Sequence, residues 1–200
     1  MAKYGEAEYW EERYARDAEP FDWYQGYRCL KPYINQAVPK ESAVLMVGCG
    51  SSRLSEDMAA DGYDEIVNID VSETIVRVMQ ERAQNMSFYV MDMRKLEFTD
   101  EEYDAVIDKG TLDTLLCMET AAEDAKQGLM EISRVLKPQG VYFMVSYGAP
   151  DTRLPYLEDG DLSWSVSVHK VEKPEAAIAK GKPGYHYIYI CQKGGLEQVG

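Results

Sequence analysis

Six short apolar runs, separated by helix-like stretches, constrain the fold of this chain more than any other feature. They occupy residues 43–48, 65–70, 87–92, 103–108, 140–147 and 186–191. Strand-like runs that alternate with helical patterns predict a mostly parallel sheet with helices on both faces. A weaker seventh run, residues 163–171, is joined to the last run by a long polar connection, residues 172–185, without a convincing helix. We therefore expect an antiparallel final strand, because parallel neighbours need a crossover connection.

Two of the intervening stretches have a clear helical period. Ser72 is placed to cap a helix in which Ile75 and Val78 recur on one face. A second apolar stripe extends over residues 125–136 and ends before Pro138. Both stripes are typical of helix faces that pack on a core.

The composition limits the size and the partners of the protein. With 200 residues, 46% of them hydrophobic, we expect one domain spanning residues 1–200. A net charge of −14 argues against nucleic acid as the main partner, because like charges repel, and favours a basic protein or a small cation. The same charge is also typical of a protein that is simply kept soluble by it.

The cysteines and the apolar runs indicate the compartment. Four dispersed cysteines and two histidines have no metal-ligand spacing, so we expect neither a metal site nor a disulfide framework. Reduced thiols fit a cytoplasmic protein. No run approaches the roughly 20 apolar residues of a membrane span, and we recognise no targeting segment.

Gly48 and Gly50 follow the first apolar run directly. Glycine is favoured where the backbone takes a left-handed angle or where another group must touch the main chain. A buried strand that leads into a glycine turn and then a helix is how open α/β sheets bind nucleotides. A dinucleotide fingerprint would need a small residue where this chain has Arg53, which disfavours a nicotinamide cofactor.

Charged residues follow three further strands at the same edge of the predicted sheet. Asp70 ends the second run, Asp92 ends the third, and Asp108 and Lys109 end the fourth. The position of Asp70 beyond the glycine turn suits a carboxylate that accepts hydrogen bonds from ribose hydroxyls. The alternative is that Asp70 only caps the helix after it, since helix N-termini favour acids.

Together these elements resemble a class I S-adenosylmethionine-dependent methyltransferase. The resemblance implies a Rossmann-like α/β fold with a seven-stranded, mostly parallel sheet, helices on both faces and an antiparallel last strand. Four segments, residues 8–27, 47–55, 108–116 and 185–195, resemble the small family that methylates a lysine of translation elongation factor 1-alpha. A similar domain occurs in vertebrates joined to an endothelin-converting protease.

The resemblance also implies which residues bind the cofactor. The implied set is Trp10, Tyr14, Trp23, Gly48, Asp70, Val71, Asp92, Met93 and Lys109. In this set Asp70 and Val71 contact the ribose, Asp92 and Met93 frame the adenine, and the lysine lies near the methionyl end. The glycine lies on the cofactor, and the three aromatic residues contact it from the amino-terminal segment.

The chain departs from the common methyltransferase pattern at two positions. Met46 stands where many of these enzymes have an acid, and Ser52 where many have a third glycine. The cofactor amine therefore needs another acceptor, for which the backbone or the carboxylate of Asp108 is a candidate. Residues 108–111 also lack the N/D-P-P-Y/F turn of enzymes that methylate adenine or amide nitrogens. The absence of this turn disfavours adenine and amide nitrogens as the methyl acceptor.

A lysine acceptor would need a channel that aligns nitrogen, methyl and sulfur, and a way to lose a proton, because its free pKa is about 10.4. Asp108 or Asp113 is placed to orient the ammonium group, and Tyr147 to line the channel. The alternative for Asp113 is that it only stabilises the N-terminus of its helix, and Lys109 has the alternative of a plain surface charge. We assign no catalytic base. A small-molecule methyltransferase and a cofactor-binding module without turnover remain alternatives, and the oligomeric state stays open.

The amino-terminal segment, residues 1–33, is unusually aromatic, with nine of the 22 Phe, Trp and Tyr residues of the chain. Trp10 and Tyr14 are four residues apart and therefore share one helix face, whereas Trp23 follows Pro20 on an expected loop. We expect this segment to cap the cofactor. Its alternative role, covering one edge of the sheet, is compatible with the first.

Overall fold

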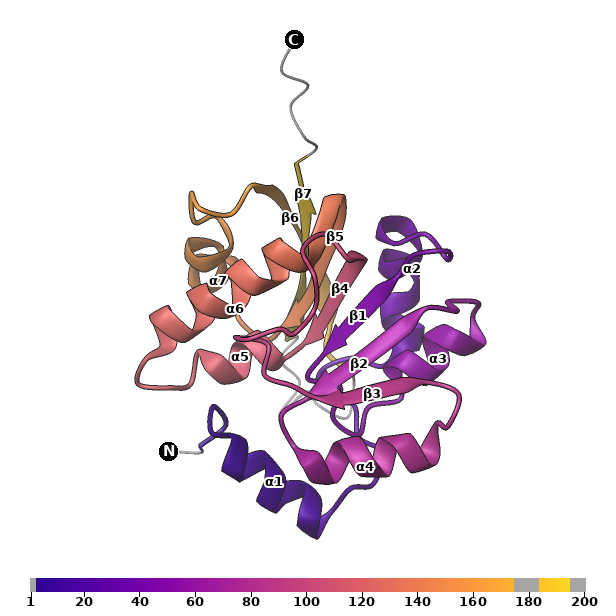
Figure 1. The fold of residues 1–200 in the computed structure, drawn as a ribbon. Coiled ribbons are helices and arrows are strands. Elements are labelled where there is room, and N and C mark those ends of the chain that lie inside the picture. The colour runs from indigo at the N-terminus through magenta and orange to yellow at the C-terminus, as the bar shows by residue number, and fades with distance from the viewer. Residues whose placement is uncertain (1–2, 175–183, 195–200) are drawn as a thin grey trace.

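The protein is an α/β sandwich built on one seven-stranded sheet (Figure 1). The computed structural model describes residues 3–174 and 184–194. The strands are β1 (Val44–Val47), β2 (Ile66–Asp70), β3 (Ser87–Val90), β4 (Tyr103–Lys109), β5 (Leu136–Ser146), β6 (Trp164–Glu172) and β7 (Tyr185–Lys193). Their order across the sheet is β3-β2-β1-β4-β5-β7-β6. Strands β1 to β5 pair in parallel, and β7 is antiparallel to both β5 and β6. The predicted fold class, including the antiparallel last strand, is confirmed.

Within the described residues, seven helices connect and cover the strands. They are α1 (Ala7–Arg16), α2 (Tyr27–Ala37), α3 (Leu54–Ala60), α4 (Glu73–Arg82), α5 (Thr111–Leu115), α6 (Ala121–Val135) and α7 (Pro150–Leu157). Buried residues of α2, α3 and α4 pack on one face of the sheet, and those of α5, α6 and α7 pack on the other. Helix α1 lies outside these two layers, beside α4 and below the tips of the strands in the view of Figure 1.

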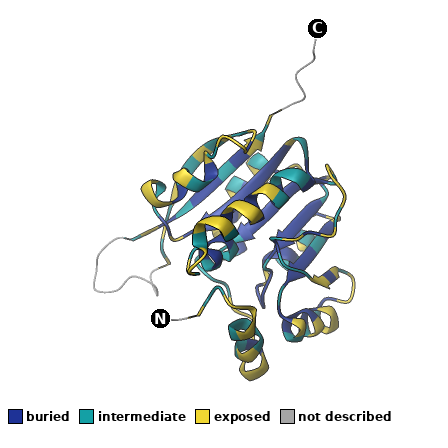
Figure 2. Ribbon diagram, turned by 60° about the vertical axis from the view of Figure 1, so that its left-hand side comes forward, coloured by how far each residue is buried: buried dark blue, intermediate teal, exposed yellow. Residues whose placement is uncertain are grey.

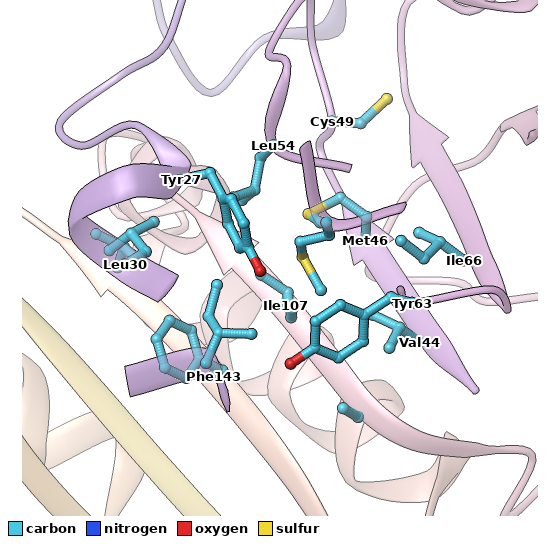
Figure 3. Packing of buried hydrophobic residues seen from close by; sticks show 14 of the residues in the cluster. Tyr27, Leu30, Val44, Met46, Cys49, Leu54, Tyr63, Ile66, Ile107 and Phe143 are labelled. Atoms are coloured by element: carbon cyan, nitrogen blue, oxygen red, sulfur yellow. The ribbon is translucent and has the colours of Figure 1, made fainter. Parts of the chain in front are cut away.

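Alternate residues of each central strand supply the two halves of the core. In β1, Val44 and Met46 belong to the cluster under α2, α3 and α4, whereas Leu45 and Val47 belong to the opposite cluster. This alternation follows from the two-residue period of a strand. Figure 3 shows Tyr27 and Leu54 close to Met46 in the first cluster, and Val44 beside Tyr63. Figure 2 shows that the central strands are buried along most of their length, as strands covered on both faces must be.

The capping prediction for the helix after β2 is confirmed. The Ser72 hydroxyl accepts a hydrogen bond from the Ile75 N–H at 3.2 Å, and α4 begins at Glu73. The hydroxyl thereby satisfies one of the free N–H groups of the first turn. Helix α4 is therefore fixed directly beside the carboxyl end of β2.

The helix predicted from the apolar stripe of residues 125–136 extends one residue too far. Helix α6 ends at Val135, and Leu136 begins β5, where it pairs with Tyr103. Pro138 disfavours the helical region for the residue before it, so the chain leaves the helix early. Leu136 remains fully buried in the second cluster, and its burial explains why it extended the helical pattern.

The predicted polar connection of residues 172–185 joins β6 and β7. Residues 175–183 lie outside the described residues, and the two strands reach its ends at Glu172 and Tyr185. Within the described residues, none of the helices is both long enough and apolar enough to cross a bilayer.

Candidate active site

A cavity of about 340 Å³ opens at the carboxyl ends of the parallel strands. It lies where the strand order reverses between β1 and β4, which is the usual ligand position in open α/β sheets. All nine residues predicted to bind the cofactor line it: Trp10, Tyr14, Trp23, Gly48, Asp70, Val71, Asp92, Met93 and Lys109. The structure therefore brings the predicted set together. Their individual contacts with a cofactor stay a prediction.

The floor of the cavity is the glycine turn after β1. Gly48 and Gly50 have φ angles of +59° and +52°, in the left-handed region that side chains disfavour. A Cβ atom on Gly48 would lie 2.1 Å from the Thr111 hydroxyl, and one on Gly50 would lie 2.6 Å from the Tyr14 hydroxyl. The two glycines thus let β1 contact both the start of α5 and the aromatic face of α1.

The Asp70 carboxylate links the glycine turn to α4. It accepts hydrogen bonds from the Gly50 N–H at 2.9 Å and from the Ser72 N–H at 3.0 Å, one on each oxygen. Burial raises the pKa of Asp70 above its ordinary value, against the opposing effect of these two N–H donors. Each oxygen accepts one of these bonds and has capacity for another, and Asp70 lines the cavity. Supporting the start of α4 and accepting ribose hydroxyls are therefore compatible roles for Asp70.

Asp92 is held at the rim by Arg94. The guanidinium Nε lies 3.0 Å from both carboxylate oxygens of Asp92, and the Arg94 N–H donates to Oδ1 at 2.8 Å. Arg94 also pairs with Asp124 of α6 at 2.5 Å. The pair fixes the Asp92 carboxylate beside Met93, at the end of the cavity nearest β3.

Asp108 and Lys109 are adjacent in sequence but point to different surroundings. Asp108 is fully buried and accepts hydrogen bonds from the N–H groups of Thr111 and Leu112 and from the Tyr142 hydroxyl. Burial raises the pKa of Asp108 to about 6. Its carboxylate caps α5 and does not line the cavity, so it is no acceptor for the cofactor amine.

Lys109 is the residue of this pair that reaches the cavity. Its Nζ donates to the Trp23 carbonyl at 3.1 Å and lies 3.0 Å from Oδ1 of Asp22. Its side chain is only 6% exposed, and this burial lowers its pKa against the opposing attraction of Asp22. Lys109 is therefore an anchor for the amino-terminal segment and no surface charge.

Aromatic residues of the part of the chain before α2, residues 3–26, line the cavity, and we call this part of the expected 1–33 segment the cap segment. Trp10 and Tyr14 stack with their centroids 5.9 Å apart on one face of α1, as their spacing predicts. Trp23 lies edge-on to Trp10 at 6.2 Å and comes from the loop after α1. The segment ends at α2, which belongs to a core layer through Leu30 and Ile34.

A carboxylate docks the cap segment on α4. Glu11 accepts a hydrogen bond from the Ser72 hydroxyl at 2.6 Å and further bonds from the hydroxyl and the N–H of Thr74. These bonds hold the pKa of Glu11 below its ordinary value. An acid at the N-terminus of α4 is also stabilised by the helix dipole.

The far end of the cavity, beside β4 and β5, is built around Asp113. Its carboxylate accepts bonds from the Tyr24 hydroxyl, the Ser146 hydroxyl, the Tyr147 N–H and Arg153 Nε, at 2.6–3.1 Å. Asp113 is 3% exposed. Two bonds to each oxygen occupy its lone pairs, so the carboxylate has no free site for a substrate ammonium. The prediction that Asp113 orients the ammonium directly is therefore not supported by this geometry.

Sequence reasoning missed two partners of Asp113: Tyr24, which lines the cavity, and Arg153, which does not. Both join Asp113 across separations of 89 and 40 residues, which no local pattern reveals. The sequence does contain one signal for Tyr24: it belongs to the aromatic-rich segment and directly follows Trp23, which is predicted to bind the cofactor. Tyr147 was expected to line a channel, and it does line the cavity, with half of its surface exposed.

The residues of the cavity fit S-adenosylmethionine. The size is within the range of about 300–1,000 Å³ found for small-molecule sites. A buried carboxylate with free lone pairs suits vicinal hydroxyls, and aromatic faces suit both a flat base and a sulfonium cation. The left-handed glycine turn leaves the backbone open to close approach.

Comparisons with a family model and with curated proteins both identify methyltransferases. The family model described as "Methyltransferase domain" matches residues 39–188. The mouse protein named "eEF1A lysine and N-terminal methyltransferase" is 34% identical over 193 residues, which are 92% of this chain and 27% of that protein. The bovine "EEF1A lysine methyltransferase 4" is 30% identical over 204 residues, 96% of this chain and 76% of that protein. The chain thus spans about a quarter of the length of the former relative and most of the latter.

Solved structures share the fold. A methyltransferase from Methanosarcina mazei, described as S-adenosylmethionine-dependent, superposes with a TM-score of 0.65 at 18% identity, covering 88% of this chain and all of that one. The [4+2]-cyclase SpnF superposes with a TM-score of 0.70 at 15% identity over 98% of this chain and 97% of that one. A fold shared with a cyclase does not fix the chemistry, so the reaction must be argued from the site and the relatives.

Proposed function

We propose, since this chain belongs to the family of S-adenosylmethionine-dependent methyltransferases, that it transfers a methyl group to a lysine side chain of eEF1A. The observation that carries the proposal is the similarity over nearly the whole chain to proteins named as eEF1A lysine methyltransferases. The cavity supports the proposal, because it is lined by all nine residues that the resemblance implies for the cofactor.

When bound, S-adenosylmethionine would supply a methyl group on a positively charged sulfur; a neutral lysine nitrogen would take this methyl group, S-adenosylhomocysteine would leave, and the methylated nitrogen would lose one proton to solvent. The residues of the chain hold the two partners in line and exclude water. In this arrangement Asp70 holds the ribose, Met93 and Asp92 lie at the adenine, and Lys109 lies near the methionyl end. The rings of Trp10, Tyr14 and Trp23 close over them from the cap segment.

The proposal includes the organisation and the setting of the protein. Residues 1–200 form one methyltransferase domain, with residues 1–33 as its aromatic amino-terminal portion. The protein acts in the cytoplasm, on a protein substrate, without nucleic acid or a membrane as partner. The net charge of −14 supports a basic protein surface as the partner, because opposite charges speed encounter.

The test is to incubate the protein with S-adenosylmethionine labelled in its methyl group, with purified eEF1A in one arm and cell extract in another. We expect label on eEF1A, no competition from added RNA at physiological salt, and label in one main protein of the extract. Label in a small molecule would favour a small-molecule methyltransferase instead. Cofactor binding with no label in any acceptor would favour a binding module without turnover.

A further inference from the structure

The carboxylate of Asp113 is saturated, and this saturation determines what Tyr24 presents to the cavity. Oδ1 accepts bonds from Ser146 and Arg153 Nε, and Oδ2 accepts bonds from the Tyr24 hydroxyl at 2.9 Å and the Tyr147 N–H at 3.1 Å. A tyrosine hydroxyl has one proton to donate and two lone pairs. Because its proton goes to Asp113, the Tyr24 oxygen is only an acceptor toward any other group.

Tyr24 is fixed in this orientation from three sides. Its backbone has φ = +64°, an angle that non-glycine residues rarely adopt. Its ring lies 4.9 Å from that of His186, and a Cβ atom on Gly110 would lie 3.0 Å from the ring. A strained residue that its neighbours hold in place is common at functional sites. Burial and the nearby Asp113 raise the pKa of Tyr24 far above its ordinary value, so the hydroxyl keeps its proton.

The position of Tyr24 along the cavity matches the acceptor end of the reaction. Asp92 follows β3 and Asp70 ends β2, whereas Tyr24 contacts Asp113 of α5, which follows β4. A cofactor whose adenine and ribose lie at β3 and β2 extends toward β4, so its methyl group points to this end. The Tyr147 ring lies 6.2 Å from the Tyr24 ring and is 51% exposed, at the opening of the cavity. Two aromatic rings at this spacing suit the long apolar stem and the cationic end of a lysine.

We propose that the Tyr24 hydroxyl accepts a hydrogen bond from the nitrogen of the target lysine, between the rings of Tyr24 and Tyr147. Asp113 is the positioning residue, since it takes the Tyr24 proton and so turns the oxygen lone pairs toward the substrate. A neutral lysine nitrogen that donates one N–H to Tyr24 has a fixed orientation, and its lone pair stays available for the methyl carbon. This inference rests on the proposed function and names the residues that select its acceptor.

The first experiment compares Tyr24→Phe with Tyr33→Phe, a matched control outside the cavity whose hydroxyl has no hydrogen bond among the described residues. Each protein is titrated with S-adenosylhomocysteine by calorimetry and assayed for kcat and KM with eEF1A. We expect Tyr24→Phe to bind S-adenosylhomocysteine within about twofold of the wild type and to lose about tenfold or more in kcat/KM, as for loss of one hydrogen bond to a charged or polar group. The control should match the wild type in both measurements.

The second experiment tests the positioning role with Asp113→Asn. The amide NH₂ can donate to Tyr24 and would turn the Tyr24 proton into the cavity, which removes the acceptor. We expect a loss in kcat/KM, and the double variant Tyr24→Phe/Asp113→Asn should lose less than twofold more than the worse single variant. Losses that multiply would overturn the positioning role, because they would show that the two residues act independently.

Three outcomes overturn the inference about Tyr24, and they can be told apart. Wild-type kcat/KM in Tyr24→Phe would show that the hydroxyl does not contact the acceptor. If Tyr24→Phe lost as much affinity for S-adenosylhomocysteine as it lost in kcat/KM, the hydroxyl would be assigned to the cofactor. Absence of eEF1A methylation by the wild type would overturn the proposed function, and the inference with it.

Discussion

Removing the contact between Lys109 and the cap segment tests whether this contact keeps the cavity closed. Lys109→Met removes the bond from Nζ to the Trp23 carbonyl at 3.1 Å and the ion pair with Asp22 at 3.0 Å. A hydrogen bond from a charged donor contributes about 1.5–3 kcal/mol. The Lys109 side chain is 6% exposed and the Asp22 side chain 28%, so the abandoned aspartate regains water and adds little to this loss. We therefore expect closure to weaken by about 2 kcal/mol.

If the closed cap segment contributes to cofactor binding, this loss corresponds to at most about a 30-fold weaker affinity for S-adenosylhomocysteine. Calorimetric titration measures the affinity, and hydrogen exchange of residues 18–26 measures the opening of the segment. Lys31→Met is the matched control, because it breaks an exposed ion pair with Asp61 away from the cavity. We expect that control to bind the cofactor product as the wild type does.

Lys109 also lines the cavity, so a double-mutant cycle with Asp22→Asn separates its two roles. Asp22 does not line the cavity, and its carboxylate binds Lys109 and accepts a hydrogen bond from the Ser52 hydroxyl, so the cycle isolates the part of its effect that depends on Lys109. We expect the two substitutions to be coupled by about 1–2 kcal/mol in S-adenosylhomocysteine affinity. Additive losses, or a Lys109→Met variant with wild-type affinity and wild-type hydrogen exchange, would refute the anchoring role of Lys109.

Three further predictions follow from the same geometry. Asp70→Ala should weaken S-adenosylhomocysteine binding by about 1.5–3 kcal/mol and also lower the Tm, because the Gly50 and Ser72 N–H groups lose their acceptor; calorimetry showing unchanged affinity would exclude a ribose contact. His186, whose pKa burial lowers to about 4 from 6.5, should stabilise the protein above pH 6.5 and lose this contribution as the pH falls toward 4, because the unfolded chain takes up the proton first. At pH 5 the loss is about 2 kcal/mol, so denaturant unfolding of His186→Gln should depend less on pH than that of the wild type, and equal pH profiles would refute this assignment. Deleting residues 1–24 should leave a folded protein by circular dichroism that binds S-adenosylmethionine weakly; full-strength binding would refute a covering role for the segment, and unfolding would assign it to the core.

The sheet could be predicted from the sequence because its determinants are local. The apolar runs that become β1, β2 and β4 are buried on both faces, so they read as continuous apolar stretches. The end of α6 could not be placed to the residue, because Leu136 is fully buried whether it ends a helix or starts a strand. Burial fixes the apolar character of a position, but the backbone before Pro138 decides its conformation.

The candidate site could be predicted in part for the same reason. Asp70 and Lys109 are the last residues of β2 and β4, so their place at one sheet edge follows from the topology. The direction of a side chain does not follow from it: Asp108, next to Lys109, turns into the core to cap α5. The bond between Tyr24 and Asp113 joins residues 89 apart, and only the folded chain reveals it.

Peptide mapping of eEF1A decides whether this protein methylates one of its lysines. Purified eEF1A is incubated with this protein and with S-adenosylmethionine that has a deuterated methyl group, and its peptides are analysed by mass spectrometry while S-adenosylhomocysteine is quantified. We expect deuterated methyl on the side-chain nitrogen of a lysine, with one S-adenosylhomocysteine formed for each methyl group transferred. Formation of S-adenosylhomocysteine without any labelled lysine in eEF1A would contradict this expectation.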